Sequence, residues 1–351
     1  MKYNTLGNSN LKVSEYCLGS MTWGEASSES VGHWQLDAAI EHGINFVDTA
    51  EMYPTNPMRR ETAGQTEQII GNWIKKRKHH DDLLLATKIT GEGSVTIRDG
   101  GPITKTQMIK SLDESLKKLN AEYIDLYQLH WPNRGSYHFR KYWQFDASTQ
   151  STKAMDDHVQ EILSISTDLI AKGKIRALGL SNESAWGTMK FLQHAKQNNK
   201  TKIVSIQNEY SLLCRLFDTD LAEVCHHENI QLLSFSPLAA GLLTGKYQNN
   251  KIPKGSRLEI TADSSPNLSG RIGSNTFNAV EKYLNLAQKF NIDPTHMALA
   301  FCASRPFMGS VIFGATTNKQ LSHILKGLDI SLSSEILTEI DQVNRLKPMP
   351  I

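Results

Sequence analysis

The chain has 351 residues, of which 39% are hydrophobic and 21% charged, with a formal net charge of +2. This balance is ordinary for a globular protein and argues against nucleic acid or an anionic membrane as a partner. No apolar run approaches the roughly eighteen residues that span a bilayer, the N-terminus has no signal-like apolar core, and the four cysteines are scattered. We therefore expect a soluble cytoplasmic protein with reduced thiols.

Along the chain, a short N-terminal hairpin is followed by eight alternations of strand and helix. The hairpin covers residues 2–14, around a Gly-Asn-Ser-Asn turn. Strands are predicted at 16–19, 45–48, 83–88, 124–130, 175–180, 203–207, 230–236 and 310–313. The helices that follow them are predicted at 30–42, 66–76, 105–119, 159–171, 184–198, 219–227, 277–290 and 319–327, with extra helices at 294–304 and 334–344. Eight such units predict an α/β fold, a (β/α)8 TIM barrel that occupies residues 1–351 as a single domain.

Three connections, at 51–65, 90–104 and 131–156, are too long to be bare turns. All three follow barrel strands, so we expect them on the catalytic face as lids or binding loops. The third is rich in aromatic residues with basic residues between them. Two interpretations stay open for these aromatic rings, namely packing onto the barrel mouth and direct contact with a substrate.

Four titratable residues follow predicted strands in the first 130 residues: Asp48, Tyr53, Lys88 and His130. In a parallel barrel the carboxyl ends of the strands open on one face, where such enzymes do their chemistry. Taken singly, a strand-end Asp or Lys is more often part of a structural ion pair, and a loop Tyr is more often a packing residue. Together, and in this order, the four favour a proton-transfer site.

The segments around these four residues resemble the aldo-keto reductases, NADPH-dependent barrels that reduce carbonyl compounds. The run from Gly43 to Tyr53 is similar to the second-strand signature of that family. Ala86-Thr87-Lys88 and the run from Asp125 to Pro132 are similar to its third and fourth strands. The resemblance extends over essentially the whole chain. Within the family, the long loops and the residues at positions 50–54 look most like those of the Tas-type bacterial reductases, relatives of the potassium-channel β subunits.

The resemblance gives each of the four residues a role. Reduction by hydride leaves negative charge on the carbonyl oxygen, so an acid must deliver a proton there, and Tyr53 is the expected donor. Tyrosine is a poor acid at neutral pH, and we expect the neighbouring Lys88 ammonium to lower its pKa. Asp48 would hold that ammonium in an ion pair, while His130 would donate to the carbonyl oxygen and orient it.

The expected cofactor residues lie in the second half of the chain. No Gly-x-Gly-x-x-Gly follows the first strand, so a Rossmann module is unsupported. By resemblance, Ser181, Asn182 and Gln207 contact the nicotinamide carboxamide, which needs both donors and acceptors, and the ring stacks on Tyr210. The strand-seven segment looks like a pyrophosphate loop, with candidate positions at Ser236, Pro237, Leu238, Gly241, Leu243, Gly245, Lys246 and Arg257.

After the eighth strand, Gly314, Thr316 and Gln320 match the adenosine 2′-phosphate loop of the family, which favours NADPH over NADH. The chain departs from the family at Ile324, where relatives usually carry an Asn that contacts the adenine ring. His323 could replace that contact by stacking, although a surface histidine is the simpler interpretation. The histidine pairs at 79–80 and 226–227 lack the spacing of a metal motif, so no metal is expected.

The sequence therefore predicts an NADPH-dependent reductase of aldehydes or ketones. Residues expected to select the small-molecule carbonyl substrate are Trp23, Trp131 and Arg134. An alternative is an NADPH-binding redox sensor with little turnover, as the likeness to the channel β subunits allows. A remoter alternative, a phosphate-binding isomerase or lyase, leaves Asn182 and Gln207 without a role. The natural substrate and the oligomeric state are not specified by the sequence.

Overall fold

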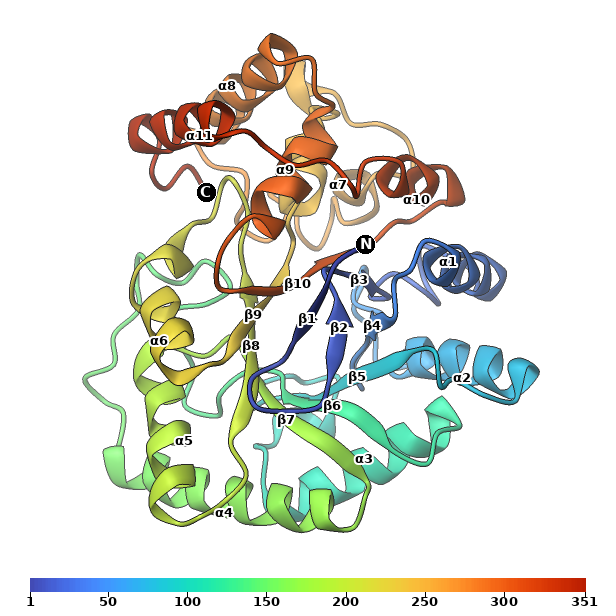
Figure 1. Cartoon of the computed structure of the whole chain (residues 1–351), viewed down its shortest axis with the longest axis vertical. Coiled ribbons are helices and arrows are strands. Elements are labelled where there is room, and N and C mark those ends of the chain that lie inside the picture. Colours follow the sequence, from blue (N-terminus) through green and yellow to red (C-terminus); the bar gives the residue numbers. More distant parts are fainter.

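Eight parallel strands close into a barrel in the computed structural model, which describes residues 1–351 (Figure 1). The order around the barrel is β10-β3-β4-β5-β6-β7-β8-β9, so every neighbour along the chain is a neighbour in space and β10 closes the ring on β3. This confirms the predicted (β/α)8 barrel. The strands are β3 (Tyr16–Gly19), β4 (Phe46–Asp48), β5 (Leu84–Ile89), β6 (Ile124–Leu129), β7 (Ile175–Ser181), β8 (Ile203–Glu209), β9 (Gln231–Phe235) and β10 (Met308–Phe313).

The N-terminal hairpin plugs one end of the barrel. Strands β1 (Tyr3–Thr5) and β2 (Lys12–Ser14) pair antiparallel, as predicted. Leu6, Leu11 and Val13 are almost completely buried, and they pack on the inward-facing side chains of the barrel strands. Those inward side chains include Phe46, Ala86, Leu126, Ala177, Val204 and Leu233. Because one end is sealed by apolar packing, ligands can enter only at the other end, where the strands finish.

Helices surround the barrel, and most begin at a residue whose hydroxyl accepts a backbone N–H, as Ser28, Thr104, Ser184 and Ser333 do. Together with the short helices near the barrel mouth, they are α1 (Glu29–Glu41), α2 (Gln65–Arg77), α3 (Lys105–Leu119), α4 (Thr152–Ala171), α5 (Ala185–Gln197), α6 (Asp220–Glu228), α7 (Arg257–Ile260), α8 (Thr276–Lys289), α9 (Pro294–Ala303), α10 (Asn318–Leu325) and α11 (Ser334–Leu346). Four 3-10 segments, at 98–100, 216–218, 239–244 and 248–250, were not expected from the sequence pattern.

One helix prediction needs correction. Helix α4 begins at Thr152, seven residues before the predicted start, because Ser151 caps it through the N–H of Ala154. The helix predicted at 277–290 is present as α8. Helix α9 packs against β10 and is buried on nearly all sides, whereas α8 packs outside it against α11 (Figure 1). A helix that is buried on nearly all sides and mostly apolar, such as α9, is typical of an inner layer.

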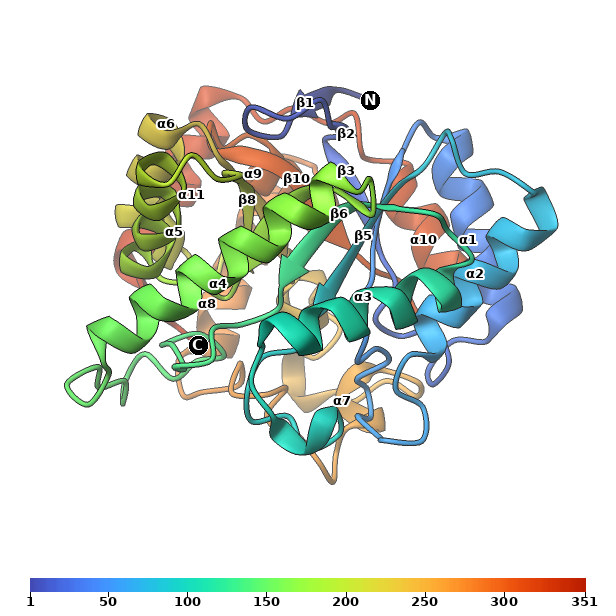
Figure 2. The ribbon, with the colours of Figure 1, turned by 90° about the horizontal axis from the view of Figure 1, so that it is seen from below.

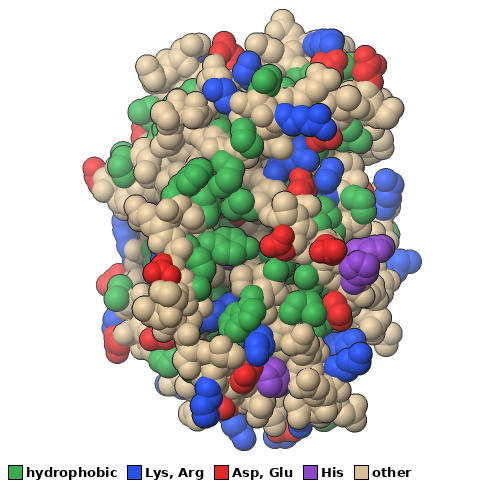
Figure 3. Space-filling model, turned by 90° about the vertical axis from the view of Figure 1, so that its left-hand side faces the viewer, with side chains coloured by type: hydrophobic (Ala, Val, Ile, Leu, Met, Phe, Trp, Pro, Cys, Tyr) green, Lys and Arg blue, Asp and Glu red, His purple; other side chains and the backbone are tan.

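Figure 2 shows the two ends of the barrel, with the β1–β2 hairpin at the top and α7 with the long loops at the bottom. Figure 3 views the flank to the left of Figure 1, on which hydrophobic side chains gather in the middle and charges of both signs are scattered around them. None of the helices is both long enough and apolar enough to cross a membrane. The four cysteines are buried and unpaired.

Candidate active site

A cavity of about 1410 Å³ opens at the carboxyl ends of the barrel strands. Pockets for drug-sized molecules usually measure about 300–1,000 Å³, so this one has room for a larger ligand or for two ligands together. All three long loops contribute to its wall, as predicted: Tyr53 comes from the first, Glu92 from the second, and Trp131 and Phe139 from the third.

The Lys88 ammonium is the centre of the polar network at the base of the cavity. Its side chain is completely buried. Nζ lies 2.6 Å from Asp48 Oδ2, 2.7 Å from the carbonyl oxygen of Thr49 and 3.4 Å from the Tyr53 hydroxyl oxygen. An ammonium group has three N–H donors, and these three acceptors satisfy all of them. Burial alone would lower the pKa of Lys88, but Asp48 and Tyr53 together hold it above its ordinary value.

The second oxygen of Asp48 is held by two amides. Gln207 Nε2 donates to Oδ1 at 2.8 Å and Gln128 Nε2 donates at 3.3 Å. Gln207 Nε2 also donates to Gln128 Oε1 at 3.1 Å. Because a carboxylate only accepts hydrogen bonds, these contacts turn the Gln207 nitrogen toward Asp48 and leave its Oε1 without a protein donor. Asp48 therefore contacts both Lys88 and the β8 side of the cavity, through Gln207.

Tyr53 lies where a proton donor to a ligand should lie, on the cavity wall and beside Lys88. Its hydroxyl oxygen accepts from Lys88, so its own proton is free to point elsewhere. The expectation that the Tyr53 pKa falls below its ordinary value is wrong for this structure. Burial raises the pKa of Tyr53 by more than the Lys88 charge lowers it, although Lys88 acts in the predicted direction.

His130 stands edge-on to Tyr53, with ring centroids 5.7 Å apart. Burial, assisted by the charge of Lys88, holds the pKa of His130 well below its ordinary value, so the imidazole is neutral at neutral pH. Its Nδ1 is buried without a hydrogen-bond partner. A neutral imidazole can donate from one nitrogen only. The structure thus brings all four predicted residues together, with His130 in a form that can orient an oxygen without protonating it.

Asn182 and Gln207 present unused acceptors on the adjacent wall. Asn182 Nδ2 donates to the His130 carbonyl oxygen at 2.9 Å and to Ser181 Oγ at 3.1 Å. Its Oδ1 is buried with no partner, which is costly unless a ligand donates to it. Both side chains line the cavity. These acceptors fit a carboxamide NH2 group such as that of nicotinamide.

Two of the residues that were predicted to contact the nicotinamide do not lie on the cavity wall. Ser181 does not reach the cavity, because its hydroxyl donates to the carbonyl oxygen of Gln207 and it supports Asn182 from behind. Tyr210 is fully buried, stacks on Phe301 and donates to Asp218 at 2.6 Å, so the prediction that a nicotinamide stacks on it is wrong. The aromatic ring on this wall is Phe235, at the end of β9. The sequence feature that could have identified Phe235 is its position directly before Ser236-Pro237-Leu238.

The segment after β9 lines the cavity through Ser236, Pro237, Leu238, Gly241 and Lys246. A Cβ atom at Gly241 would lie 2.8 Å from Lys246 Nζ, so glycine lets the lysine fold over the loop. Lys246 pairs with no carboxylate. Of the predicted positions, Leu243 and Gly245 are not on the cavity wall. Leu243 is buried in the main core, and Gly245 ends the 3-10 turn with a φ of +78°.

Three guanidinium groups surround one carboxylate beside this segment. Arg140 from the third long loop and Arg271 both bind Glu209, the latter at 2.8 Å. Arg257 has no carboxylate partner, and burial together with the charges of Arg271 and Arg140 lowers its pKa to about 10. Arg257, Arg140 and Arg271 all line the cavity. With Lys246 they leave an excess of positive charge that suits phosphate groups. Sequence reasoning had not assigned Arg271 or Glu209 to the site.

The residues after β10 line the far end of the cavity. Gly314, Thr316 and Gln320 are all on its wall, as are His323 and Ile324. Gln320 Oε1 accepts from both the backbone N–H and the hydroxyl of Thr316, each at 2.9 Å, at the start of α10. Ile324 presents an apolar side chain here, as its position in the sequence implied.

The three predicted substrate residues meet different outcomes. Trp131 lines the cavity, with its Nε1 donating to the Glu92 carbonyl oxygen at 2.9 Å. Trp23 is fully buried beneath α1 and donates to Gln35, so its assignment is wrong. Arg134 points away from the cavity and binds Glu183 with both arms, so that assignment is wrong as well. Among the loop aromatics, Phe139 reaches the cavity, while Tyr137 and Phe145 pack on each other.

Comparison with known proteins agrees with this geometry. A model described as "Aldo/keto reductase family" matches residues 15–345. "Protein tas" of Escherichia coli (strain K12) is 39% identical over 354 residues, which cover 100% of this chain and 99% of that protein. The chain belongs to the aldo-keto reductase family. Its likeness to Tas-type proteins confirms the branch that the sequence pattern indicated.

Two further relatives of this aldo-keto reductase have informative names. "Uncharacterized oxidoreductase YrpG" of Bacillus subtilis (strain 168) is 28% identical over 349 residues, which cover 98% of this chain and 96% of that protein. "Aldo-keto reductase" of Babesia bovis is 34% identical over 253 residues, which cover 68% of this chain and 87% of that protein. Family membership makes the chain an oxidoreductase of a class that generally uses NAD(P)H and acts on small carbonyl compounds.

The depressed pKa of His130 predicts a specific pH dependence of stability. As the pH falls below the ordinary histidine value of 6.5, the unfolded chain takes up a proton here and the folded aldo-keto reductase does not. The stability contributed by this group is therefore complete above pH 6.5 and lost as the pH falls. In urea unfolding between about pH 6.5 and 5, His130→Gln should reduce the loss of unfolding free energy by up to about 1.4 kcal/mol per pH unit.

The matched control for this measurement is His227→Gln, because His227 is exposed at the end of α6. That variant should follow the wild-type curve. Parallel curves for wild type and His130→Gln would mean that His130 titrates normally in the folded protein.

Proposed function

We propose that the whole chain acts as one NADPH-dependent carbonyl reductase unit that converts aldehydes or ketones to alcohols, with Tyr53 as the proton donor. The observation that carries this proposal is the Lys88 ammonium, which holds Asp48, Thr49 and Tyr53 at one end of a large cavity. Such a site supplies a proton next to the acceptors of Asn182 and Gln207.

The residues present fit a nicotinamide dinucleotide along the length of the cavity. Asn182 Oδ1 and Gln207 Oε1 would accept from the carboxamide, and Phe235 would provide the flat surface for the ring. Lys246 and Arg257, which have no carboxylate partner, would hold the phosphates. When bound, the reduced nicotinamide supplies the hydride.

The residues of this chain carry the proton side of the reaction. The carbonyl oxygen would lie between Tyr53 and the neutral imidazole of His130, whose rings stand edge to face. As negative charge grows on that oxygen, His130 donates a hydrogen bond to it and Tyr53 transfers its proton. The phenolate left on Tyr53 is stabilised by Lys88, which already donates to the same oxygen. Proton uptake from solvent then restores the phenol.

NADPH rather than NADH is proposed because of the loop after β10. Thr316 and Gln320 form a hydrogen-bonded pair at the N-terminus of α10, where backbone N–H groups favour an anion. Lys319 also lines this part of the cavity. A 2′-phosphate would gain these contacts, and a 2′-hydroxyl would not.

The substrate side of the cavity is bordered by Trp131 and Phe139, whose rings meet at right angles with centroids 5.9 Å apart. This wall favours apolar or aromatic carbonyl compounds. NADPH oxidation with a panel of aromatic aldehydes, diketones and quinones tests the activity. Tight NADPH binding without turnover on any carbonyl would favour the redox-sensing alternative instead.

Replacement of the proton donor should separate chemistry from binding. Tyr53→Phe should lower kcat by about 10²–10⁴-fold, the usual contribution of a positioned general acid, while the dissociation constant for NADPH stays within about twofold. Tyr3→Phe is the control, because that hydroxyl lies on the hairpin and donates to Gly43. Steady-state kinetics and fluorescence titration provide the two readouts. Undiminished turnover in Tyr53→Phe would remove Tyr53 from the mechanism.

The phosphate assignment can be tested within one segment. Lys246→Met should weaken NADPH binding at least about tenfold, because a charge-assisted hydrogen bond contributes about 1.5–3 kcal/mol. Lys251→Met is the matched control, since Lys251 is exposed and outside the cavity. Equal NADPH affinity in the two variants, measured by fluorescence titration, would show that Lys246 does not contact the cofactor.

A further inference from the structure

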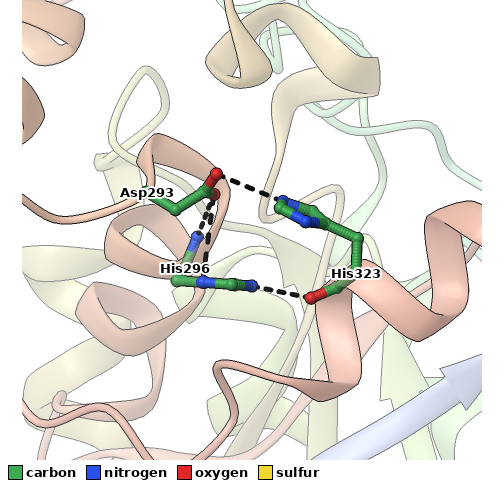
Figure 4. A group of neighbouring side chains, drawn as sticks. All are labelled: Asp293, His296 and His323. Atoms are coloured by element: carbon green, nitrogen blue, oxygen red, sulfur yellow. Dashed lines mark hydrogen bonds and ion pairs between the residues drawn. The ribbon is translucent and has the colours of Figure 1, made fainter.

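Three side chains that can bind metal ions meet beside the far end of the cavity. Asp293 precedes α9, His296 is in its first turn, and His323 comes from α10 (Figure 4). Asp293 and His323 line the cavity. One oxygen or ring nitrogen from each residue lies within 4.8 Å of those of the other two. Asp293 and His296 are three residues apart, but His323 lies 27 residues further along the chain, so the fold is needed to bring the group together.

The structure orients His296 before any ligand arrives. Its Nε2 is 2.8 Å from the carbonyl oxygen of His323, and a carbonyl can only accept, so Nε2 carries the hydrogen. Nδ1 then offers a lone pair on the side of Asp293. The ring is also fixed by packing, because a Cβ atom at Gly327 would lie 2.2 Å from it. A ring N–H held by a carbonyl is the usual support of a metal-binding histidine.

The Nδ1 atom of His296 has no hydrogen-bond partner, although the residue is only 9% exposed. The nearest carboxylate atom, Asp293 Oδ1, is 4.0 Å away, which is too far for a hydrogen bond. The Nδ1 lone pair therefore faces the carboxylate across a gap with no hydrogen bond between them. A cation between the two would give Nδ1 a partner.

Asp293 and His323 complete the donor set. Asp293 Oδ1 accepts from the backbone N–H groups of Thr295 and His296, while Oδ2 lies 3.2 Å from His323 Nε2. The two imidazole rings are stacked, with centroids 4.8 Å apart.

We propose that Asp293, His296 and His323 form a zinc-binding site. Two imidazole nitrogens and one carboxylate oxygen are a donor set typical of zinc, whereas calcium and magnesium prefer oxygen ligands alone. Tetrahedral zinc ligands lie about 3.4 Å apart, given metal–ligand bonds of about 2.0–2.1 Å. The widest separation in the group, at most 4.8 Å, must therefore shrink by up to about 1.4 Å, and the half-exposed His323 side chain can move that far. Three protein ligands leave one coordination position, which a water molecule can fill.

Zinc binding to the metal-free, tag-free full chain tests the proposal. Zn²⁺ is titrated in competition with a chromophoric chelator, and the wild type should bind one equivalent. His323→Ala should weaken binding at least about tenfold, because even the loss of a supporting group around a metal site costs about 10–100-fold. Asp293→Asn should weaken it as well, while it keeps the cap of α9, since Asn caps helices as well as Asp does.

His227→Ala is the control, because it removes an exposed histidine that has a neighbouring histidine but no carboxylate partner. That variant should bind zinc as the wild type does. Thermal unfolding gives a second readout, since a ligand that binds only the folded state raises Tm, and zinc should do so for wild type and His227→Ala but not for His323→Ala. Zinc affinities that are equal in wild type and His323→Ala, or no binding by the wild type, would overturn the proposal.

Discussion

The buried ion pair between Lys88 and Asp48 is the constraint on which the rest of the site depends. Removal of two charges from water is costly and is repaid only when each charge is fully hydrogen-bonded. Here the ammonium has three acceptors, and the carboxylate receives donors from β6 and β8 as well. Because the pair is fully satisfied, it ties β4, β5, β6 and β8 together at the base of the cavity and fixes the position of Tyr53.

Polar groups along the cavity wall differ in how far the protein pairs them. At the base of the site, hydrogen bonds within the protein pair the polar groups, whereas polar atoms higher on the wall are left unpaired. Asn182 Oδ1 lacks a donor, and Lys246 and Arg257 lack an anionic partner. Unpaired groups of this kind cost stability in the free protein and are repaid when a ligand binds. The cavity is therefore polarised, with a rigid proton-donating end and a cationic end.

The sequence predicted the parts that follow from periodicity and from strand ends. The barrel and the four residues at its base lie at the predicted places, because the end of a parallel strand determines which face a residue reaches. It failed where side-chain direction or packing decides. Tyr210 and Trp23 lie near the ends of the expected strands, but their side chains are buried in the core. Arg134 forms an ion pair with Glu183 instead of facing the cavity. The pKa of Tyr53 also could not be predicted, since burial outweighs the nearby charge.

The pKa of Tyr53 in the double variant Asp48→Asn/Lys88→Met tests the central claim most directly. This variant removes both charges, so no unpaired buried charge remains to unfold the protein. Lys88 lowers the pKa of Tyr53 more than Asp48 raises it. With tyrosine labelled at ¹³Cζ and the Tyr53 signal assigned through Tyr53→Phe, the account predicts that Tyr53 titrates at a higher pH in the variant than in the wild type. Titration at the same or a lower pH would contradict it.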